Sequence, residues 1–177
     1  TNAQFDRFVQ QTDYETTAER RGHSLVFDRQ QSAWREVAGV HWRHPENPNS
    51  SLAGKEAYPV VHVSWHDAVA YAAWADKRLP SEAEYEYAAR GGLLDCDYPW
   101  GRKRAPGAVQ LANSWQGPFP EEDLGLDGFR GTSPVQQFPP NRFGLYDMAG
   151  NIQQWCWDWH GTYAGGLDPR GLGTGSA

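Results

Sequence analysis

The sequence of 177 residues has little cysteine and no long apolar run. Its 2 cysteines, Cys96 and Cys156, form neither a CxxC pair nor a spaced set of metal ligands, so they indicate neither a disulfide scaffold nor a structural zinc site. No apolar stretch approaches the roughly 18 residues that a membrane-spanning helix requires. We therefore expect a soluble, single-domain protein without a membrane partner, and the bacterial cytoplasm is the favoured compartment.

An excess of basic charge is also missing. The chain has 16 Lys and Arg against 22 Asp and Glu, which gives a net charge of -6. Nucleic-acid-binding surfaces need clustered positive charge, so we expect no nucleic acid partner. The 6 histidines show no His-Glu-x-x-His or His-x-Glu spacing, and a catalytic zinc or iron site among them is not expected.

Large aromatic rings, in contrast, are abundant. The chain has 9 Trp, 8 Tyr and 7 Phe together with 19 Gly and 12 Pro, which indicates a core of rings under loops. Five tryptophans could line a peptide groove, although packing in the core is the expected role of most of them. These five are Trp34, Trp42, Trp155, Trp157 and Trp159.

Polar capping residues predict three helices. Thr1 and Gln4 form a capping box that opens a helix at the start of the chain, and Ser64 caps a helix over 65–74. A second capping box, from Ser81 to Glu84, opens a helix over 82–90 that ends at the glycine pair 91–92.

Strand signals are short and few. The β-branched segment 60–63 predicts a strand, and a further strand is possible at 24–27. The rest of the region from Thr12 to Leu52 shows no lasting period and predicts a packed loop region.

Beyond Leu93, glycine and proline recur too often for regular elements, and the many aromatic residues argue against disorder. Two groups of oxygen donors could hold these loops around a hard cation such as Ca²⁺. One group combines Asn113 and Ser114 with Asp127 and Phe129, and the other spans 147–154. The alternative is a solvated acidic loop and an ordinary turn, which spacing alone favours.

Neither cysteine has the surroundings of an activated nucleophile. Cys96 lies between Asp95 and Asp97, whose charges should raise the pKa of its thiol. The aromatic neighbours of Cys156 indicate burial, which also disfavours the thiolate. We expect structural roles for both and name no catalytic residue.

Several segments resemble the formylglycine-generating enzyme, or sulfatase-modifying factor, family. The most specific block runs from Val60 to Gly92 and contains Lys77-Arg78-Leu79-Pro80-Ser81-Glu82-Ala83-Glu84-Tyr85. Further matching segments follow in family order at residues 98–101, 113–117, 127–129 and 143–151.

The resemblance implies an α+β fold, the formylglycine-generating-enzyme variant of the C-type lectin fold, which is rich in loops and low in regular secondary structure. It also implies two structural calcium ions. The first would take the Asn113 side chain, the Ser114 carbonyl, Asp127 and the Phe129 carbonyl; the second would take Asp147, the Gly150 and Ile152 carbonyls and Gln154. In this light, calcium becomes the favoured explanation of both oxygen groups.

The chain departs from the family at the second group. The family commonly has Trp-Glu-Trp where this sequence has Gln153-Gln154-Trp155. Glutamine keeps an oxygen ligand but removes a charge, so calcium affinity there should be weaker. The tryptophan replaced by Gln153 lies near the active site of the enzymes, so the resemblance implies a pocket that differs from theirs at this position.

Family enzymes oxidise a cysteine in a short sulfatase motif to formylglycine, with O₂ and a copper ion held by two cysteines. These cysteines follow a segment that would begin near Gly173, so we expect the catalytic pair, and copper with it, only beyond Ala177. Residues 1–177 would then form a single sulfatase-modifying-factor-type domain without its N-terminal strand and C-terminal catalytic segment. The expected partner is a peptide segment of a sulfatase or another protein ligand.

Two other functions stay open at this point. The domain could be a non-catalytic ligand-binding module, as in retroelement variable proteins or kinase-associated domains, because function resides in sites and not in folds. It could also be the related domain of an iron-dependent sulfoxide synthase. A cysteine pair beyond Ala177 would favour the oxidase, and an upstream His-rich helical domain would favour the synthase.

Overall fold

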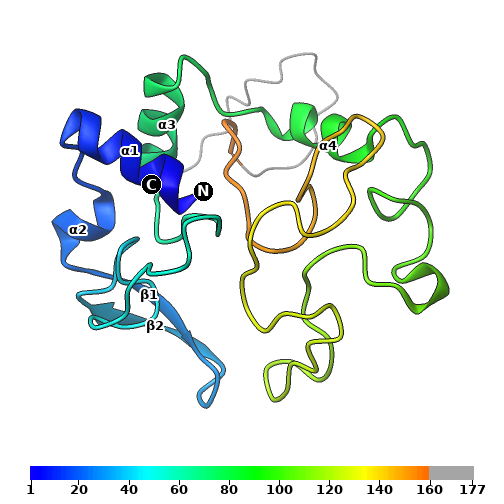
Figure 1. Ribbon diagram of the computed structural model, residues 1–177, viewed down its shortest axis with the longest axis horizontal. Helices are drawn as coiled ribbons and strands as arrows, with labels where there is room; N and C mark the ends of the chain where they lie inside the picture. Colours follow the sequence, from blue (N-terminus) through cyan, green and yellow to red (C-terminus); the bar gives the residue numbers. More distant parts are fainter. Residues whose placement is uncertain (160–177) are drawn as a thin grey trace.

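A computed structural model describes residues 1–159 and is drawn in Figure 1. Three helices and a hairpin occupy one side of the molecule, while α4 and long loops occupy the other. The elements are α1 (Asn2–Thr12), α2 (Thr17–Arg21), β1 (His23–Asp28), β2 (Ala33–Ala38), α3 (Trp65–Trp74), α4 (Glu82–Arg90) and the short 3-10 helix η1 (Pro106–Ala108). None of the helices in this described part is long and apolar enough to cross a membrane.

The three helices predicted from capping residues are confirmed as α1, α3 and α4. Thr1, Ser64 and Ser81 each accept a hydrogen bond from the main chain three residues on, and each box is closed by the side chain at that position. Gly91 ends α4 in the left-handed conformation, with φ 55°.

The prediction of a loop region from Thr12 to Leu52 is wrong in two places. A fourth capping box, between Thr16 and Glu19, opens the short helix α2. The strands β1 and β2 then form an antiparallel hairpin in which Phe27 is paired with Trp34. The possible strand at 24–27 lies within β1, whereas β2 has no alternating pattern of its own and exists through its pairing.

The predicted strand at 60–63 is also wrong. His62 has φ 57°, a left-handed conformation that interrupts an extended chain. Its imidazole Nε2 lies 2.8 Å from the Pro45 carbonyl oxygen, and its Nδ1 lies 2.9 Å from the Ser24 hydroxyl. The side chain therefore ties this segment to β1 and to the loop before it, in place of strand pairing.

Aromatic rings form the core, as their abundance predicts. Phe5 and Phe8 of α1 pack edge-on against each other, and Phe5 packs against Trp42 with ring centroids 5.2 Å apart. Tyr71 and Trp74 of α3 cover this cluster from the other side. The core thus joins α1 and α3.

The expectation that most of the five tryptophans pack in the core is wrong. Trp42 is 1% exposed, but the other four are exposed by 67%, 51%, 43% and 60% in Trp34, Trp155, Trp157 and Trp159. A core residue needs neighbours on all sides, and composition alone does not show which rings obtain them.

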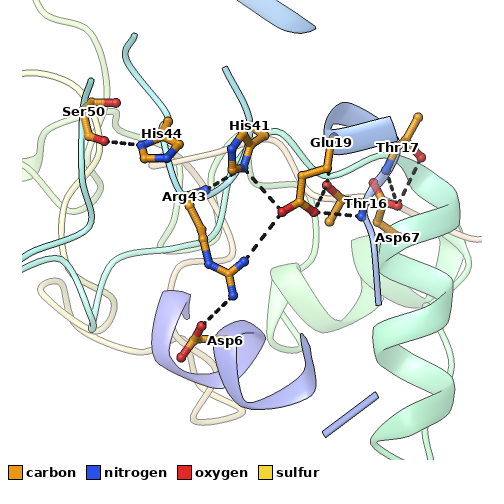
Figure 2. Close-up of polar contacts among 9 residues, drawn as sticks. All are labelled: Asp6, Thr16, Thr17, Glu19, His41, Arg43, His44, Ser50 and Asp67. Carbon is orange, nitrogen blue, oxygen red and sulfur yellow. Dashed lines mark hydrogen bonds and ion pairs between the residues drawn. The ribbon is translucent and has the colours of Figure 1, made fainter. Parts of the chain in front are cut away.

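Asp67 is a fully buried carboxylate that joins two helices. Its Oδ2 accepts a 2.7 Å hydrogen bond from the Ser64 N–H at the start of α3. Its Oδ1 accepts bonds from the Thr17 N–H at the start of α2 and from the Tyr14 hydroxyl, both at 3.0 Å. Burial, together with the bond to Asp67, raises the pKa of Tyr14. Several donors thus compensate the buried charge, and Figure 2 shows those of Thr17.

Glu19 forms a second polar link beside it (Figure 2). While it caps α2, its Oε1 lies 3.6 Å from Arg43 Nη1 and 3.6 Å from His41 Nδ1. Arg43 Nη2 reaches Asp6 of α1 at 3.2 Å. These pairs fasten α1 and α2 to the segment that carries the buried Trp42.

We predict that His62 makes stability depend on pH. Burial of the imidazole lowers the pKa of His62 below its ordinary 6.5, an effect that the Pro45 carbonyl opposes. The unfolded chain therefore binds the proton more readily, so stability is complete above pH 6.5 and falls as the pH drops below it. Asparagine tolerates the positive φ at position 62. Between about pH 7.5 and 5.5, the melting temperature of His62→Asn should therefore fall less than that of the wild type.

Exposed His66 provides the control for this prediction. His66→Asn should keep the acid sensitivity of the wild type. Burial also lowers the pKa of His41, so part of the sensitivity should persist in His62→Asn. Equal acid sensitivity in His62→Asn and wild type would contradict the prediction.

Candidate functional site

The expectation that loops dominate beyond Leu93 is confirmed as far as Trp159, where η1 is the one regular element. These loops run from green to orange in Figure 1. The two predicted groups of oxygen donors lie within them, and we call them the first oxygen loop (residues 113–129) and the second oxygen loop (residues 147–154).

In the first oxygen loop, predicted ligands converge on one point. The Asp127 carboxylate accepts hydrogen bonds from the Ser114 N–H at 2.8 Å and the Phe129 N–H at 2.9 Å. The side-chain amide nitrogen of Gln116 donates to Asp127 Oδ2 at 2.6 Å and also to the Ser114 carbonyl. A carboxylate and a main-chain carbonyl, both predicted calcium ligands, therefore meet at one side-chain amide nitrogen.

The other two predicted ligands lie close by. Asn113 is buried, and its Nδ2 donates to the Gly131 carbonyl at 2.8 Å. The Phe129 carbonyl lies against Gly125, 3.3 Å from where a Cβ atom would stand. Gln116, which was not predicted, is 7% exposed, and its Oε1 accepts the Asp127 N–H at 3.3 Å. These oxygen types fit a hard cation such as Ca²⁺.

The second oxygen loop is arranged differently. Asp147 Oδ2 accepts the Gln136 N–H at 2.7 Å, and the Asp147 carbonyl accepts the Gln154 side-chain amide at 2.8 Å. The Gly150 carbonyl accepts the Ile152 N–H at 2.8 Å. Oxygens of Asp147 and Gly150 are thus already bonded to protein donors, in three separate contacts.

The two loops contact each other directly. The Asn151 N–H donates to the Asn113 carbonyl at 2.8 Å. Asn151 Oδ1 accepts the Ser133 N–H at 2.9 Å, and its Nδ2 donates to the Ser133 carbonyl at 3.1 Å. Sequence reasoning missed Asn151 as a joint, although Gly150-Asn151 is a turn-type pair.

Gly150 makes this contact possible. A Cβ atom on Gly150 would stand 2.1 Å from the Asn113 carbonyl oxygen, well inside van der Waals contact. Its φ of 76° also favours glycine. The second loop can therefore approach the first only with glycine at this position.

The segment 155–158 anchors the second oxygen loop to the helices. Trp155 Nε1 donates to the Val63 carbonyl at 3.0 Å, and the Trp157 N–H donates to the Pro80 carbonyl at 2.8 Å. Asp158 accepts the Glu82 N–H at 2.7 Å at the start of α4. Loop and helix starts are therefore held together.

Both cysteines are free of disulfides. Burial, and then the charges of Asp158 and Glu82, raises the pKa of the Cys156 thiol. Its carbonyl accepts the Trp65 indole N–H at 2.9 Å. Cys96 Sγ contacts the Leu94 carbonyl at 3.4 Å. The raised pKa of Cys156 disfavours the reactive thiolate, as its sequence setting predicts.

No group of three or more His, Cys, Asp or Glu side chains that could hold a metal is present among residues 1–159. A cation in either oxygen loop would therefore depend on amide and main-chain carbonyl oxygens as well as on carboxylates. A cavity of about 220 Å³ borders the second loop, and sequence reasoning did not identify it. Its lining includes Leu93, Trp100, Leu111, Phe138, Arg142 and Asp147.

From Leu93 to Trp159, hydrogen bonds and loop contacts hold the chain with η1 as its one regular element. A family model described as sulfatase-modifying factor enzyme 1-like domain (FGE-sulfatase) matches residues 1–175. The chain therefore belongs to the FGE-sulfatase family, which confirms the resemblance found in the sequence.

Some relatives in this family are named as enzymes, and others are named as inactive. The chain is 49% identical over 197 residues to the formylglycine-generating enzyme of Thermomonospora curvata, covering 99% of this chain and 65% of that protein. It is 47% identical over 171 residues to the Bos taurus protein named inactive C-alpha-formylglycine-generating enzyme 2, covering 88% of this chain and 56% of that protein. The chain thus spans less than two thirds of either relative.

Solved structures show the same fold. PvdO from Pseudomonas aeruginosa matches with a TM-score of 0.58 and 29% identity, covering 90% of this chain and 54% of that one. Treponema denticola variable protein 1 matches with a TM-score of 0.53 and 21% identity, covering 77% of this chain and 69% of that one. The second likeness is one of fold alone.

We predict that Gly150→Ala separates the two oxygen loops. The new methyl group would force the Asn113 main chain to move, so the variant should lose about 3 kcal/mol in the free energy of unfolding measured with urea. Gly144→Ala is a matched control, because Gly144 has φ 77° and nothing within 4 Å of its Cβ position. It should lose only about 1 kcal/mol, from backbone strain. Equal losses would contradict the role of the contact.

Proposed function

We propose that the full protein is a formylglycine-generating oxidase that converts a cysteine in a sulfatase peptide to formylglycine. The observation that supports this most is the 49% identity to an enzyme of that name across 99% of the chain. Residues 1–177 form a single domain of the C-type lectin type in this proposal.

The catalytic copper is bound elsewhere in this proposal. Cys156 has a raised thiol pKa and Cys96 lies in a separate segment, so neither binds copper in this proposal, which requires a cysteine pair elsewhere in the full protein. Copper, when bound, supplies the chemistry with O₂. In this proposal, residues 1–159 form the ordered scaffold and present a surface that binds the peptide.

Exposed indoles supply part of this peptide surface. Trp155 is 51% exposed although its indole N–H donates to the Val63 carbonyl, and Trp157 is 43% exposed although its main-chain N–H donates to the Pro80 carbonyl. The Trp157 ring also packs against Trp65, with centroids 5.3 Å apart. Fixed aromatic rings bind peptides at low cost in conformational entropy, which suits a substrate groove.

An inactive binding module is the second candidate. The inactive-named bovine relative is 47% identical over 88% of this chain, close to the value for the named enzyme. Gln153 and Gln154, where the family commonly has Trp and Glu, also favour it. Without a copper site, the same surface would bind a protein ligand without oxidising it.

An activity measurement separates the two candidates. We expect the full-length protein, supplied with copper, O₂ and a thiol reductant, to convert a cysteine peptide of the sulfatase motif to an aldehyde. Mass spectrometry with hydrazide capture detects the product. A peptide with serine in place of cysteine is the control. Binding of the cysteine peptide without aldehyde formation would favour the inactive module.

We further propose that the first oxygen loop binds a structural Ca²⁺. Calcium at about one hundred times its Kd would stabilise the folded state by about 2.7 kcal/mol. Chelation with EGTA should therefore lower the melting temperature by about 5–10 °C. Asp127→Ala should melt near the chelated value and respond little to calcium, whereas exposed Glu121→Ala should behave like wild type. A melting temperature that EGTA leaves unchanged would refute this site.

A further inference from the structure

The second oxygen loop contains a side-chain amide where the family places an acidic ligand. Gln154 Nε2 lies 2.8 Å from the Asp147 carbonyl oxygen. Because a carbonyl can only accept, the group of Gln154 at this contact must be the N–H donor. The side-chain oxygen is the only atom of Gln154's amide that could bind a metal, and it does not take part in this contact.

Other predicted ligands of this loop are also bonded to protein donors. The Asp147 carboxylate receives the Gln136 N–H at 2.7 Å, and the Gly150 carbonyl receives the Ile152 N–H at 2.8 Å. The loop is fixed further where the Tyr85 hydroxyl of α4 donates to the Met148 carbonyl at 3.2 Å. The hydrogen bonds that order this loop are thus internal to the protein.

The two oxygen loops differ in charge and in convergence. In the first, the Gln116 amide contacts a carboxylate and a carbonyl together, and the contacts of Asp127 with Ser114, Gln116 and Phe129 are all to neutral N–H groups. A cation would compensate that charge better than an amide does. In the second loop, the Gln154 amide contacts a carbonyl alone.

The number of acidic residues points the same way. Asp147 is the only acid in the sequence 147–154, whereas the first loop has buried Asp123 beside Asp127. Asp123 Oδ1 accepts the Gly125 N–H at 3.1 Å and so helps to shape that loop. Each predicted ligand set has one carboxylate, but the additional carboxylate of Asp123 makes the surroundings of the first loop more favourable for a cation.

From these contacts we propose that the Gln154 side-chain amide takes the place of a metal ion in the second oxygen loop. The protein then binds calcium at the first oxygen loop alone, which is the part of the inference that rests on the proposed calcium function. A glutamate at position 154 has no N–H group for the Asp147 carbonyl, and it restores an acidic ligand. Glutamine at position 154 thus holds the loop through its amide, whereas glutamate there would let a metal ion hold it.

Calcium stoichiometry tests this inference. Equilibrium dialysis of the full chain against Ca²⁺, with metal analysis by mass spectrometry, should give one ion for wild type and two for Gln154→Glu. Gln153→Glu adds the same charge at the neighbouring exposed position and should still give one. Two ions in wild type, or no gain in Gln154→Glu, would overturn the inference.

Thermal melting of Gln154→Ala gives an independent reading. This variant removes the N–H donor without adding a ligand, so its melting temperature should fall by about 2 °C, equally in calcium and in EGTA. A fall that appears only in calcium would identify residue 154 as a metal ligand and overturn the inference.

The stoichiometry also separates this inference from the calcium proposal for the first loop. Asp127→Ala alone should bind no calcium. The double variant Asp127→Ala, Gln154→Glu should keep the one ion gained through Gln154→Glu. If wild type binds no calcium, the first-loop proposal fails, while the gain in Gln154→Glu still decides the role of residue 154.

Discussion

Main-chain N–H and C=O groups outside helices and strands need other partners, and the loops beyond Leu93 obtain them from polar side chains and from the main chain of other loop segments. The contact between Asn113 and the Gly150-Asn151 turn is the centre of this arrangement. It brings the two oxygen loops together, and Asn151 extends it to buried Ser133. The shape of each candidate ion site depends on this contact, because it fixes the backbone that carries the oxygens.

The helical side of the molecule orients these loops through a few long-range bonds. Asp67 joins the starts of α2 and α3, and Asp158 and Trp157 attach the last described segment to the start of α4. Because the helix ends serve as attachment points, polar groups left open at helix starts become links between elements. The exposed indoles of Trp155 and Trp157 owe their fixed positions to this frame.

Family membership and local chemistry answer different questions about this protein. Similarity over the whole chain shows membership of the FGE-sulfatase family, and the hydrogen bonds within the two oxygen loops show how each loop is held. The first loop has the charge and the convergence that calcium favours, whereas the second has an amide that completes its own hydrogen bonds. In our proposal, the residue type at position 154 determines whether an amide or a metal ion holds this loop.

The sequence by itself determined the helices α1, α3 and α4 and the family, because capping boxes and short motifs are local patterns within a few residues. It also indicated which residues carry the candidate oxygen ligands. Only the tertiary structure decided the pairing of β2, the turn at His62, the exposure of the tryptophans and the hydrogen bond from Gln154 to Asp147. Each of these depends on contacts between groups whose approach local sequence patterns do not encode.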